Sequence, residues 1–169
     1  LGFCTMALGA TDKATEFFEK GLTMPTMFMW LMRPRLLCGL ALVALSQNRL
    51  EEAQQKVAEA RAFAEERAMQ NIYPLVSMTD AQVVAHAGDL EASLGHYHRA
   101  EELAHQMGMR PWLWQAQAAQ AKTLAALGRE EAAEAKRRAA LAGIDEMAAL
   151  FQDAELRVLF VESAMKKVV

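Results

Sequence analysis

The sequence contains few of the residues that cross-link or interrupt small extracellular domains. It has two cysteines, four prolines and nine glycines in 169 residues. A secreted disulfide scaffold carries more cysteine at closer spacing, whereas Cys4 and Cys38 lie far apart in apolar helical sequence. The first residues also lack the basic region and cleavage site of a signal peptide. We therefore expect two buried thiols and a cytoplasmic location.

Positive charge and long apolar runs are also scarce. The chain has 18 lysine and arginine residues against 21 acidic residues, a net charge of −3, and no basic block. A nucleic-acid surface needs clustered positive charge, so we expect no direct contact with nucleic acid. The longest apolar run, Leu36–Leu45, is ten residues long, which is too short for a membrane-spanning helix. We expect no membrane partner.

Catalytic and metal-binding motifs are missing too. The sequence has no phosphate-binding glycine loop, no nucleophile elbow and no paired-cysteine zinc motif. His98, Glu102 and His105 are spaced to share one helical face, a pattern that can bind zinc. Structural zinc sites usually draw ligands from more than one element, however, and these residues, like His96, fall on a helix with a solvated face. We favour surface histidines and expect no enzyme activity, no cofactor and no metal.

The sequence does contain a skeleton of small residues that recurs at a spacing of about 40. The turn residues that show this spacing are Gly9, Asn48, Gly88 and Gly128. Small residues keep a fixed distance from each turn: Gly2, Ala41, Ala81 and Ala121 before it, then Ala14, Ala53, Ser93 and Ala133, and finally Gly21, Ala60, Ala100 and Ala140 after it. A fixed period with small residues tied to a turn is typical of a repeat array.

Helical spacing of apolar residues fills the segments between these turns. The predicted first helices cover residues 1–8, 34–45, 74–87 and 111–127, and the second helices cover 12–24, 50–69, 90–107 and 129–150. Pro34, Pro74 and Pro111 are predicted to mark the first turns of their helices. Asn48 and Glu51 are predicted to form a capping pair at the start of the following helix.

A final helix is predicted after Asp153, which can cap it. This helix runs from Ala154 to about Lys166. Repeat arrays need a terminal cap because the last repeat has no neighbour to bury its apolar side. The residues predicted to cover that open end are Leu156, Leu159, Phe160 and Met165.

These elements predict an all-α fold, an α-solenoid of about four antiparallel helix pairs with a C-terminal capping helix. We expect one repeat domain over residues 1–169, with repeats of roughly 1–33, 34–73, 74–110 and 111–150 and a capping helix over 153–167. The chain begins without methionine, and its first residues match the back half of a first helix. We therefore expect it to be part of a longer array.

The aligned repeats resemble the tetratricopeptide (TPR) family of helix–turn–helix units. The best copy has Ala81, a Gly88-Asp89 turn, Ser93, Tyr97 and Ala100 at the family positions. The slot of Tyr97 is filled by Phe18, Val57 and Arg137 in the other copies. The resemblance implies a right-handed superhelix.

The period exceeds the norm of the family, which is about 34 residues, so each helix is longer by nearly a turn. Longer pairs of this kind resemble the C-terminal arrays of LuxR-type ATP-dependent transcription activators, class III adenylate cyclases and some Ser/Thr kinases. Residues 107–160 resemble the end of such an array most closely.

The resemblance also implies that the first helices line a concave binding groove. Its candidate residues are Arg35, Cys38 and Leu42, then Met78, Gln82 and His86, and finally Ala118 and Lys122. Some family members bind a C-terminal carboxylate with a polar clamp, but Cys38, Met78 and Ala118 occupy those positions here. A groove of this composition suits an apolar peptide better. The alternative is that these residues only pack between helices.

The methionine-rich segment Met24–Met32 departs most from the repeat pattern. Methionine is common at binding surfaces that accept varied partners. Met29, Met69 and Met109 recur with the period of the repeats, which favours packing, so Phe28 and Trp30 remain as interface candidates. Trp112 and Trp114, two residues apart on one helix, cannot both face the core.

The leading hypothesis for function is a protein-interaction or sensor module that binds a peptide or partner domain and has no chemistry of its own. The resemblance places such a module within a bacterial signalling or transcription regulator. One alternative is a regulatory domain that encloses a small apolar effector. Another is a scaffold that forms homo-oligomers through Met24–Met32.

Overall fold

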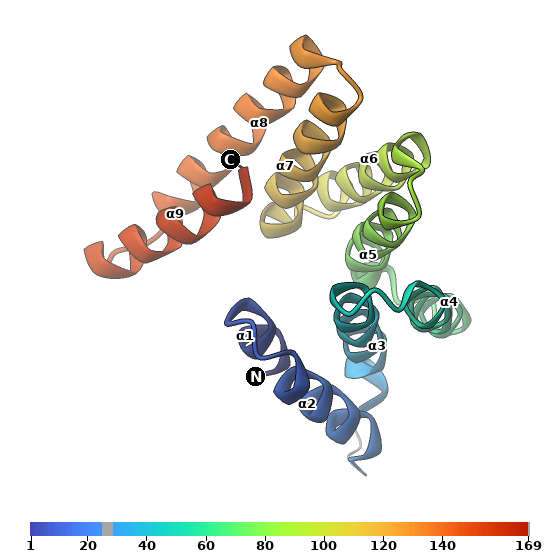
Figure 1. The fold of residues 1–169 in the computed structure, drawn as a ribbon. Coiled ribbons are helices and arrows are strands. Elements are labelled where there is room, and N and C mark those ends of the chain that lie inside the picture. Colours follow the sequence, from blue (N-terminus) through green and yellow to red (C-terminus); the bar gives the residue numbers. More distant parts are fainter. Residues whose placement is uncertain (25–28, 169) are drawn as a thin grey trace. The chain divides into compact units, whose positions relative to one another are not determined.

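The computed structural model describes residues 1–24 and 29–168, and these form an all-α protein. They divide into two compact units, Leu1–Asp89 and Leu90–Val169. The helices of the first unit are α1 (Gly2–Ala7), α2 (Thr11–Thr23), α3 (Met29–Ser46), α4 (Leu50–Glu66), the short 3-10 helix η1 (Gln70–Ile72) and α5 (Tyr73–His86). Those of the second unit are α6 (Leu90–Gln106), α7 (Arg110–Ala126), α8 (Glu130–Ala148) and α9 (Ala154–Val168) (Figure 1).

Within each unit, consecutive helices pack as antiparallel neighbours, as expected for a helical repeat array with a C-terminal helix. None of the helices in the described part of the chain is long and apolar enough to span a membrane.

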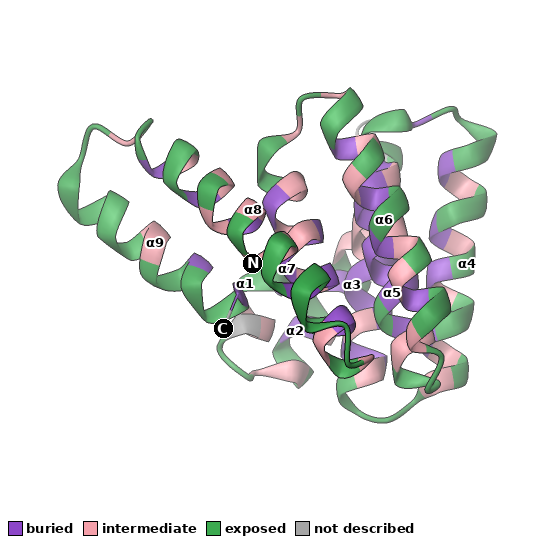
Figure 2. Ribbon diagram, turned by 90° about the horizontal axis from the view of Figure 1, so that it is seen from above, coloured by how far each residue is buried: buried purple, intermediate pink, exposed green. Residues whose placement is uncertain are grey.

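The helix α3 forms the centre of the first unit because it contacts α1, α2, α4 and α5. Its apolar residues surround the helix on nearly all sides, as a helix between several neighbours requires. Buried residues therefore occur all along its C-terminal half, at Leu37, Cys38, Leu40, Ala41, Val43 and Ala44. Figure 2 shows this concentration of buried positions on α3 and α5.

The packing of α1 and α3 around α2 depends on glycine at two positions. A Cβ atom on Gly2 or Gly39 would lie 2.4 or 2.5 Å from the ring of Phe18. The Phe18 side chain is almost fully buried and also meets Phe3 edge-on, with ring centroids 5.0 Å apart. Any side chain at either glycine would therefore displace the ring or the helix that carries it.

In the second unit, α7 contacts α6, α8 and α9. Trp114 and Ile144 are the largest buried residues of a core that α9 completes with Ala164 and Val168. Phe160 meets the Trp114 ring edge-on at 6.4 Å. Aromatic pairs in this arrangement stabilise a packing contact beyond the area they bury.

The predicted small-residue skeleton is confirmed as the packing surface of the helices. Every alanine of the three sets is 0% exposed, as is Ser93. Gly2 is buried and Gly21 is half-buried. Tyr97, Phe18 and Val57 in the aromatic slot are also buried, whereas Arg137 is half-buried and pairs with Glu134. Small side chains allow the helix backbones to approach closely, which explains why their spacing repeats.

The predicted turn residues all adopt the left-handed backbone conformation. Gly9, Asn48, Gly88 and Gly128 have φ values of 74, 57, 94 and 73°. At each turn, the amide of the next residue donates a hydrogen bond to the carbonyl five residues before it; Arg49 N, for example, lies 2.8 Å from Ala44 O. This is the bond of a Schellman motif, which satisfies the free carbonyl groups at a helix end.

A second series of turns repeats the same geometry between the helix pairs. Ala68 and Gly108 have φ values of 51 and 63°, and the amides of Met69 and Met109 donate the equivalent bonds to Ala64 and Ala104. These turns lie midway between those of the first series, so the described turns recur at half the repeat period. The second series was not predicted from the sequence, because the helix predicted over residues 50–69 runs past the end of α4 at Glu66 and covers the turn at Ala68.

The predicted capping pair at Asn48 and Glu51 is wrong. The N-cap residue of α4 is Arg49, and it makes no side-chain capping bond. Asn48 instead takes the left-handed turn position, which asparagine tolerates better than most residues. Arg49 therefore has two roles: its amide makes the Schellman bond at the C-terminus of α3, and the same residue is the N-cap of α4.

The predicted role of Pro34 is also wrong, although Pro74 and Pro111 do lie in the first turns of α5 and α7. Pro34 lies inside α3, which begins at Met29. A proline there removes one helical hydrogen bond. Its ring is nearly fully buried, so Pro34 contributes to the packing of the first unit.

The closing helix starts as predicted but presents a different face. Asp153 Oδ1 accepts hydrogen bonds from the amides of Glu155 and Leu156, which confirms the predicted cap. Of the four residues predicted to cover the end of the array, Leu156, Leu159 and Met165 are exposed and Phe160 packs. The inward stripe runs through Phe160, Ala164 and Val168 because these positions share one face at four-residue spacing.

The prediction of two buried thiols holds for Cys38 and is wrong for Cys4. The short helix α1 packs through Gly2, which leaves Cys4 and Phe3 exposed on its other sides.

Candidate functional site

The predicted groove residues divide into three groups by exposure. Cys38, Met78 and Ala118 are buried. Arg35 and Leu42 are half-buried, and Gln82, His86 and Lys122 are exposed. Cys38, Met78 and Ala118, the three positions that the resemblance matched to a carboxylate clamp, thus lie within the helix packing. The polar positions beside them remain as candidates for contact with a partner.

The buried Cys38 has a local partner. Its thiol shares a hydrogen bond with Thr79 across the contact of α3 and α5, and burial raises the pKa of the thiol to about 12. A thiol with such a pKa stays protonated at neutral pH and is a poor nucleophile. The residue therefore contributes to packing.

The two interface candidates of the methionine-rich segment differ in what the structure describes. Phe28 lies outside the described residues, as does the side chain of Met29. Trp30 belongs to α3, and its side chain is 47% exposed. Met69 is buried and Met109 is half-buried, as a shared packing position predicts.

The first unit contains an apolar cavity of about 550 Å³ between α1, α2 and α3, which we call the α1–α3 cavity. Its walls are formed by Leu1, Gly2, Phe3, Phe17, Phe18, Lys20, Gly21, Met24, Met32, Arg35 and Leu36. Several of these apolar side chains are substantially exposed, among them Phe3, Phe17, Met24 and Met32. Exposed apolar groups that converge on a hollow are typical of a binding surface.

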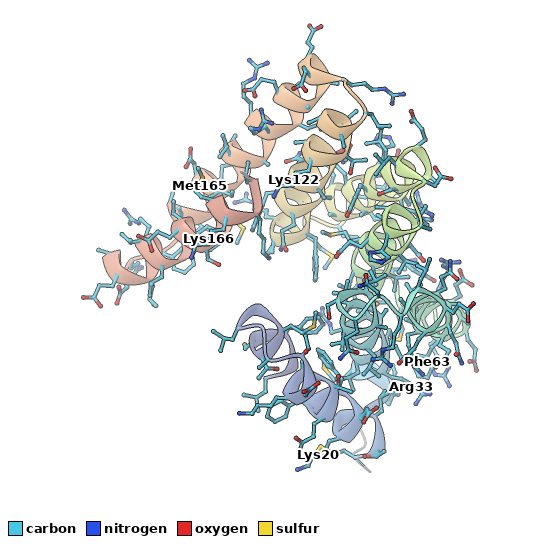
Figure 3. All side chains as sticks on the ribbon, in the orientation of Figure 1. Lys20, Arg33, Phe63, Lys122, Met165 and Lys166 are labelled. Atoms are coloured by element: carbon cyan, nitrogen blue, oxygen red, sulfur yellow. The ribbon has the colours of Figure 1, made fainter. Side chains whose placement is uncertain are left out.

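Among the described residues, the only charged side chains that line this cavity are those of Lys20 and Arg35, and no aspartate or glutamate lines it. Neither cation forms an ion pair within the part of the chain that the structure describes. Figure 3 shows Lys20 on α2, extending away from the helix bundle. The cavity is therefore apolar in its walls and positive at its margin.

A second cavity, of about 450 Å³, lies where α2, α3 and α4 meet, and we call it the Phe63 cavity. Its walls are formed by Leu22, Trp30, Arg33, Phe63, Glu66 and Arg67. The guanidinium carbon of Arg67 lies 4.0 Å from the centroid of the Phe63 ring, and that of Arg33 lies 5.6 Å from it. Both distances are within the range of cation–π attraction.

Other polar groups form contacts that hold the helices together. In the first unit, Arg61 of α4 pairs with the buried carboxylate of Asp80 of α5. In the second unit, the Glu101 carboxylate accepts hydrogen bonds from Gln117 and Gln120 of α7 and from Lys136 of α8.

The pKa of Glu101 reflects two opposing influences. Burial alone would raise it, but the hydrogen bonds from Lys136, Gln120 and Gln117 and the charge of Lys136 outweigh burial and hold the pKa below its usual value. Glu101 is therefore ionised in the folded protein at neutral pH, and its bonds link three helices.

The histidines of α6 are placed as surface residues. His98 and His105 are exposed and His96 is half-buried, and His98 pairs with Glu102 on the same helix at 3.4 Å. Within residues 1–24 and 29–168, no group of three or more His, Cys, Asp or Glu side chains is arranged to hold a metal ion.

Comparison with known proteins assigns this chain to no family. No protein-family model matches this chain, and no curated protein matches it either.

Neither cavity was predicted as a site from the sequence, although Arg35, Trp30 and the two ends of the methionine-rich segment, Met24 and Met32, line them. The sequence did contain a local signal for the Phe63 cavity. Phe63 and Arg67 have the i, i+4 spacing of residues that share a helix face, and Trp30 and Arg33 have the i, i+3 spacing. The approach of Arg33 to Phe63 joins two helices, and no periodicity along one helix predicts it.

Proposed function

We propose that this chain is a TPR-like repeat array that binds a protein segment, and that the α1–α3 cavity receives it. The segment has an apolar face and negative charge. The observation that supports this most directly is the pairing of apolar walls with Lys20 and Arg35, with no acidic residue among the described walls. Complementary charge of this kind favours an acidic partner and its orientation.

The assignment to a TPR-like array rests on the regular period of the turns and on the small residues between paired helices. Its right-handed superhelix and its place in a bacterial signalling or transcription regulator remain part of the proposal. Helix-in-groove recognition, in which an amphipathic helix lays its apolar side into a hollow, fits the cavity walls.

The test compares charge reversals on one helix. A fluorescein-labelled helical peptide with a leucine face flanked by glutamates is titrated with the protein, and fluorescence anisotropy is measured. We expect Lys20→Glu to weaken binding by about threefold to tenfold, since one exposed ion pair contributes on the order of 1 kcal/mol. The matched control is Lys13→Glu, an exposed lysine of α2 outside the cavity, and it should bind as the wild type does.

A second peptide with lysine in place of glutamate tests the charge preference. It should bind more weakly to the wild type and more tightly to Lys20→Glu. Equal affinity of the two peptides would refute the proposed partner. Retention of a small apolar molecule that blocks the peptide would favour an effector-binding domain instead.

A further inference from the structure

The Phe63 cavity has a composition different from that of the α1–α3 cavity. Flat aromatic surface and guanidinium groups dominate its walls, with Trp30 and Phe63 as the rings and Arg33 and Arg67 as the cations. Figure 3 shows Arg33 of α3 and Phe63 of α4 close together at the junction of their helices. Aromatic faces stack on planar rings, and guanidinium groups bind oxyanions through two parallel hydrogen bonds.

The two arginines are not equivalent. Arg67 stacks on Phe63 and its guanidinium also pairs with Glu66 at 2.7 Å. Arg33 has no ion pair within the described residues, and its guanidinium lies farther from the ring. Arg33 is therefore the group that remains available to an anion.

Charge limits the occupant further. The described walls carry two arginines and one glutamate, which leaves one net positive charge. A carboxylate with a single negative charge balances it, whereas a doubly charged phosphate would carry one negative charge that the described walls do not balance. The volume of about 450 Å³ falls in the range of small-molecule sites.

We propose that the Phe63 cavity binds a small aromatic carboxylate. The ring of the ligand stacks on the exposed indole of Trp30, and its carboxylate accepts hydrogen bonds from the guanidinium of Arg33. Trp30 and Arg33 lie three residues apart on α3, so both project from the same side of that helix. This site is independent of the peptide-binding function proposed for the α1–α3 cavity.

The test is isothermal titration calorimetry with 2-naphthoate, 2-naphthalenemethanol and acetate. The first has both the ring and the carboxylate, and the other two have one each. We expect 2-naphthoate to bind at least about tenfold more tightly than either of the others, because only it uses both contacts. Absence of binding, or equal affinity for the charged and neutral naphthalenes, would overturn the proposal.

Variants then assign the contacts. Arg33→Gln and Trp30→Leu should each weaken 2-naphthoate binding by about tenfold. Arg33→Lys should weaken it by less, since lysine retains the charge but cannot donate two parallel hydrogen bonds to the carboxylate. Arg138→Gln, an exposed position on α8, is the control and should bind as the wild type does. Lys20→Glu should also leave binding unchanged, which separates this site from the α1–α3 cavity.

Trp30 and Arg33 are both exposed, so their replacement should preserve the fold, and circular dichroism spectra verify this. Unchanged affinity of Arg33→Gln in a folded protein would refute the role of the guanidinium. Unchanged affinity of Trp30→Leu would refute stacking on the indole.

Discussion

Ala68 adopts a backbone conformation that disfavours a residue with a side chain. Its φ is 51°, and the equivalent residue one repeat later is Gly108, with φ of 63°. For an L-residue the left-handed region costs about 1–2 kcal/mol. The turn forms nevertheless, because the Schellman bond of Met69 and the burial of its side chain hold the chain in place.

This strain makes a testable prediction. Ala68→Gly should raise the free energy of unfolding by about 0.5–1 kcal/mol, since the relief of strain exceeds the entropic cost of glycine. Gly108→Ala should lower it by about 1 kcal/mol for the reverse reason. Urea denaturation measures both.

The control is Ala62→Gly, the same substitution at an exposed position inside α4. It should destabilise by about 1 kcal/mol, because glycine is unfavourable in a helix interior. If Ala68→Gly were as destabilising as this control, Ala68 would not adopt the left-handed conformation.

At the scale of elements, one inter-helix contact recurs with different chemistry. Arg61 meets Asp80 between α4 and α5, and one repeat later Glu101 meets Gln120 between α6 and α7. At the positions one further repeat along, Leu141 of α8 and Phe160 of α9 both pack against the core that contains Trp114, Ile144 and Ala164. The position of the contact is thus set by the repeat, whereas its chemistry differs from one helix pair to the next.

The Glu101 contact predicts a pH dependence of stability. Because the folded pKa of this carboxylate is held below the usual 4.5, its contribution is present above that value and is lost as the pH falls through the folded pKa. Glu101→Gln should therefore cost about 1–3 kcal/mol at neutral pH, and the difference from the wild type should shrink on acidification.

Denaturant unfolding at several pH values measures this effect. The control, Glu102→Gln, changes the neighbouring exposed carboxylate and should alter stability little at any pH. A cost of Glu101→Gln that stayed constant down to strongly acidic pH would show that charge is not what holds the three helices together.

At the scale of the whole molecule, burial is uneven along the chain. The six-residue helix α1 has one buried residue among those whose side chains are described, Gly2, whereas buried residues recur through the C-terminal half of α3 and from Trp114 to Leu124 in α7. A helix this short has little stability of its own and depends on its packing. Regions with few buried contacts open first.

Hydrogen–deuterium exchange should therefore be fastest in α1 and slowest in α3 and α7. Mass spectrometry of peptic fragments at neutral pH measures the order. Exchange of α1 as slow as that of α3 would show that α1 unfolds only together with the rest of its unit. Leu1 and Phe3 line the α1–α3 cavity, so peptide binding should also slow exchange in α1.

The sequence alone determined the helical class, the repeat period and the residues of closest helix approach. It could do so because these features follow from local geometry. A left-handed turn selects glycine or asparagine, as at Gly88 and Asn48, and a close backbone approach selects a small residue, as at Ala100. Each of these requirements restricts the residue type at one position, and the restriction recurs in every repeat.

Only the tertiary structure decided which residues meet between helices. The start of α3 before Pro34, the inward face of α9 and the approach of Arg33 to Phe63 all depend on how side chains of different helices pack. Burial of an apolar side chain is favourable against any neighbour of suitable shape, so the sequence pattern does not predict which neighbour it contacts. The two candidate binding cavities arise from such contacts, which is why they became visible only in the folded chain.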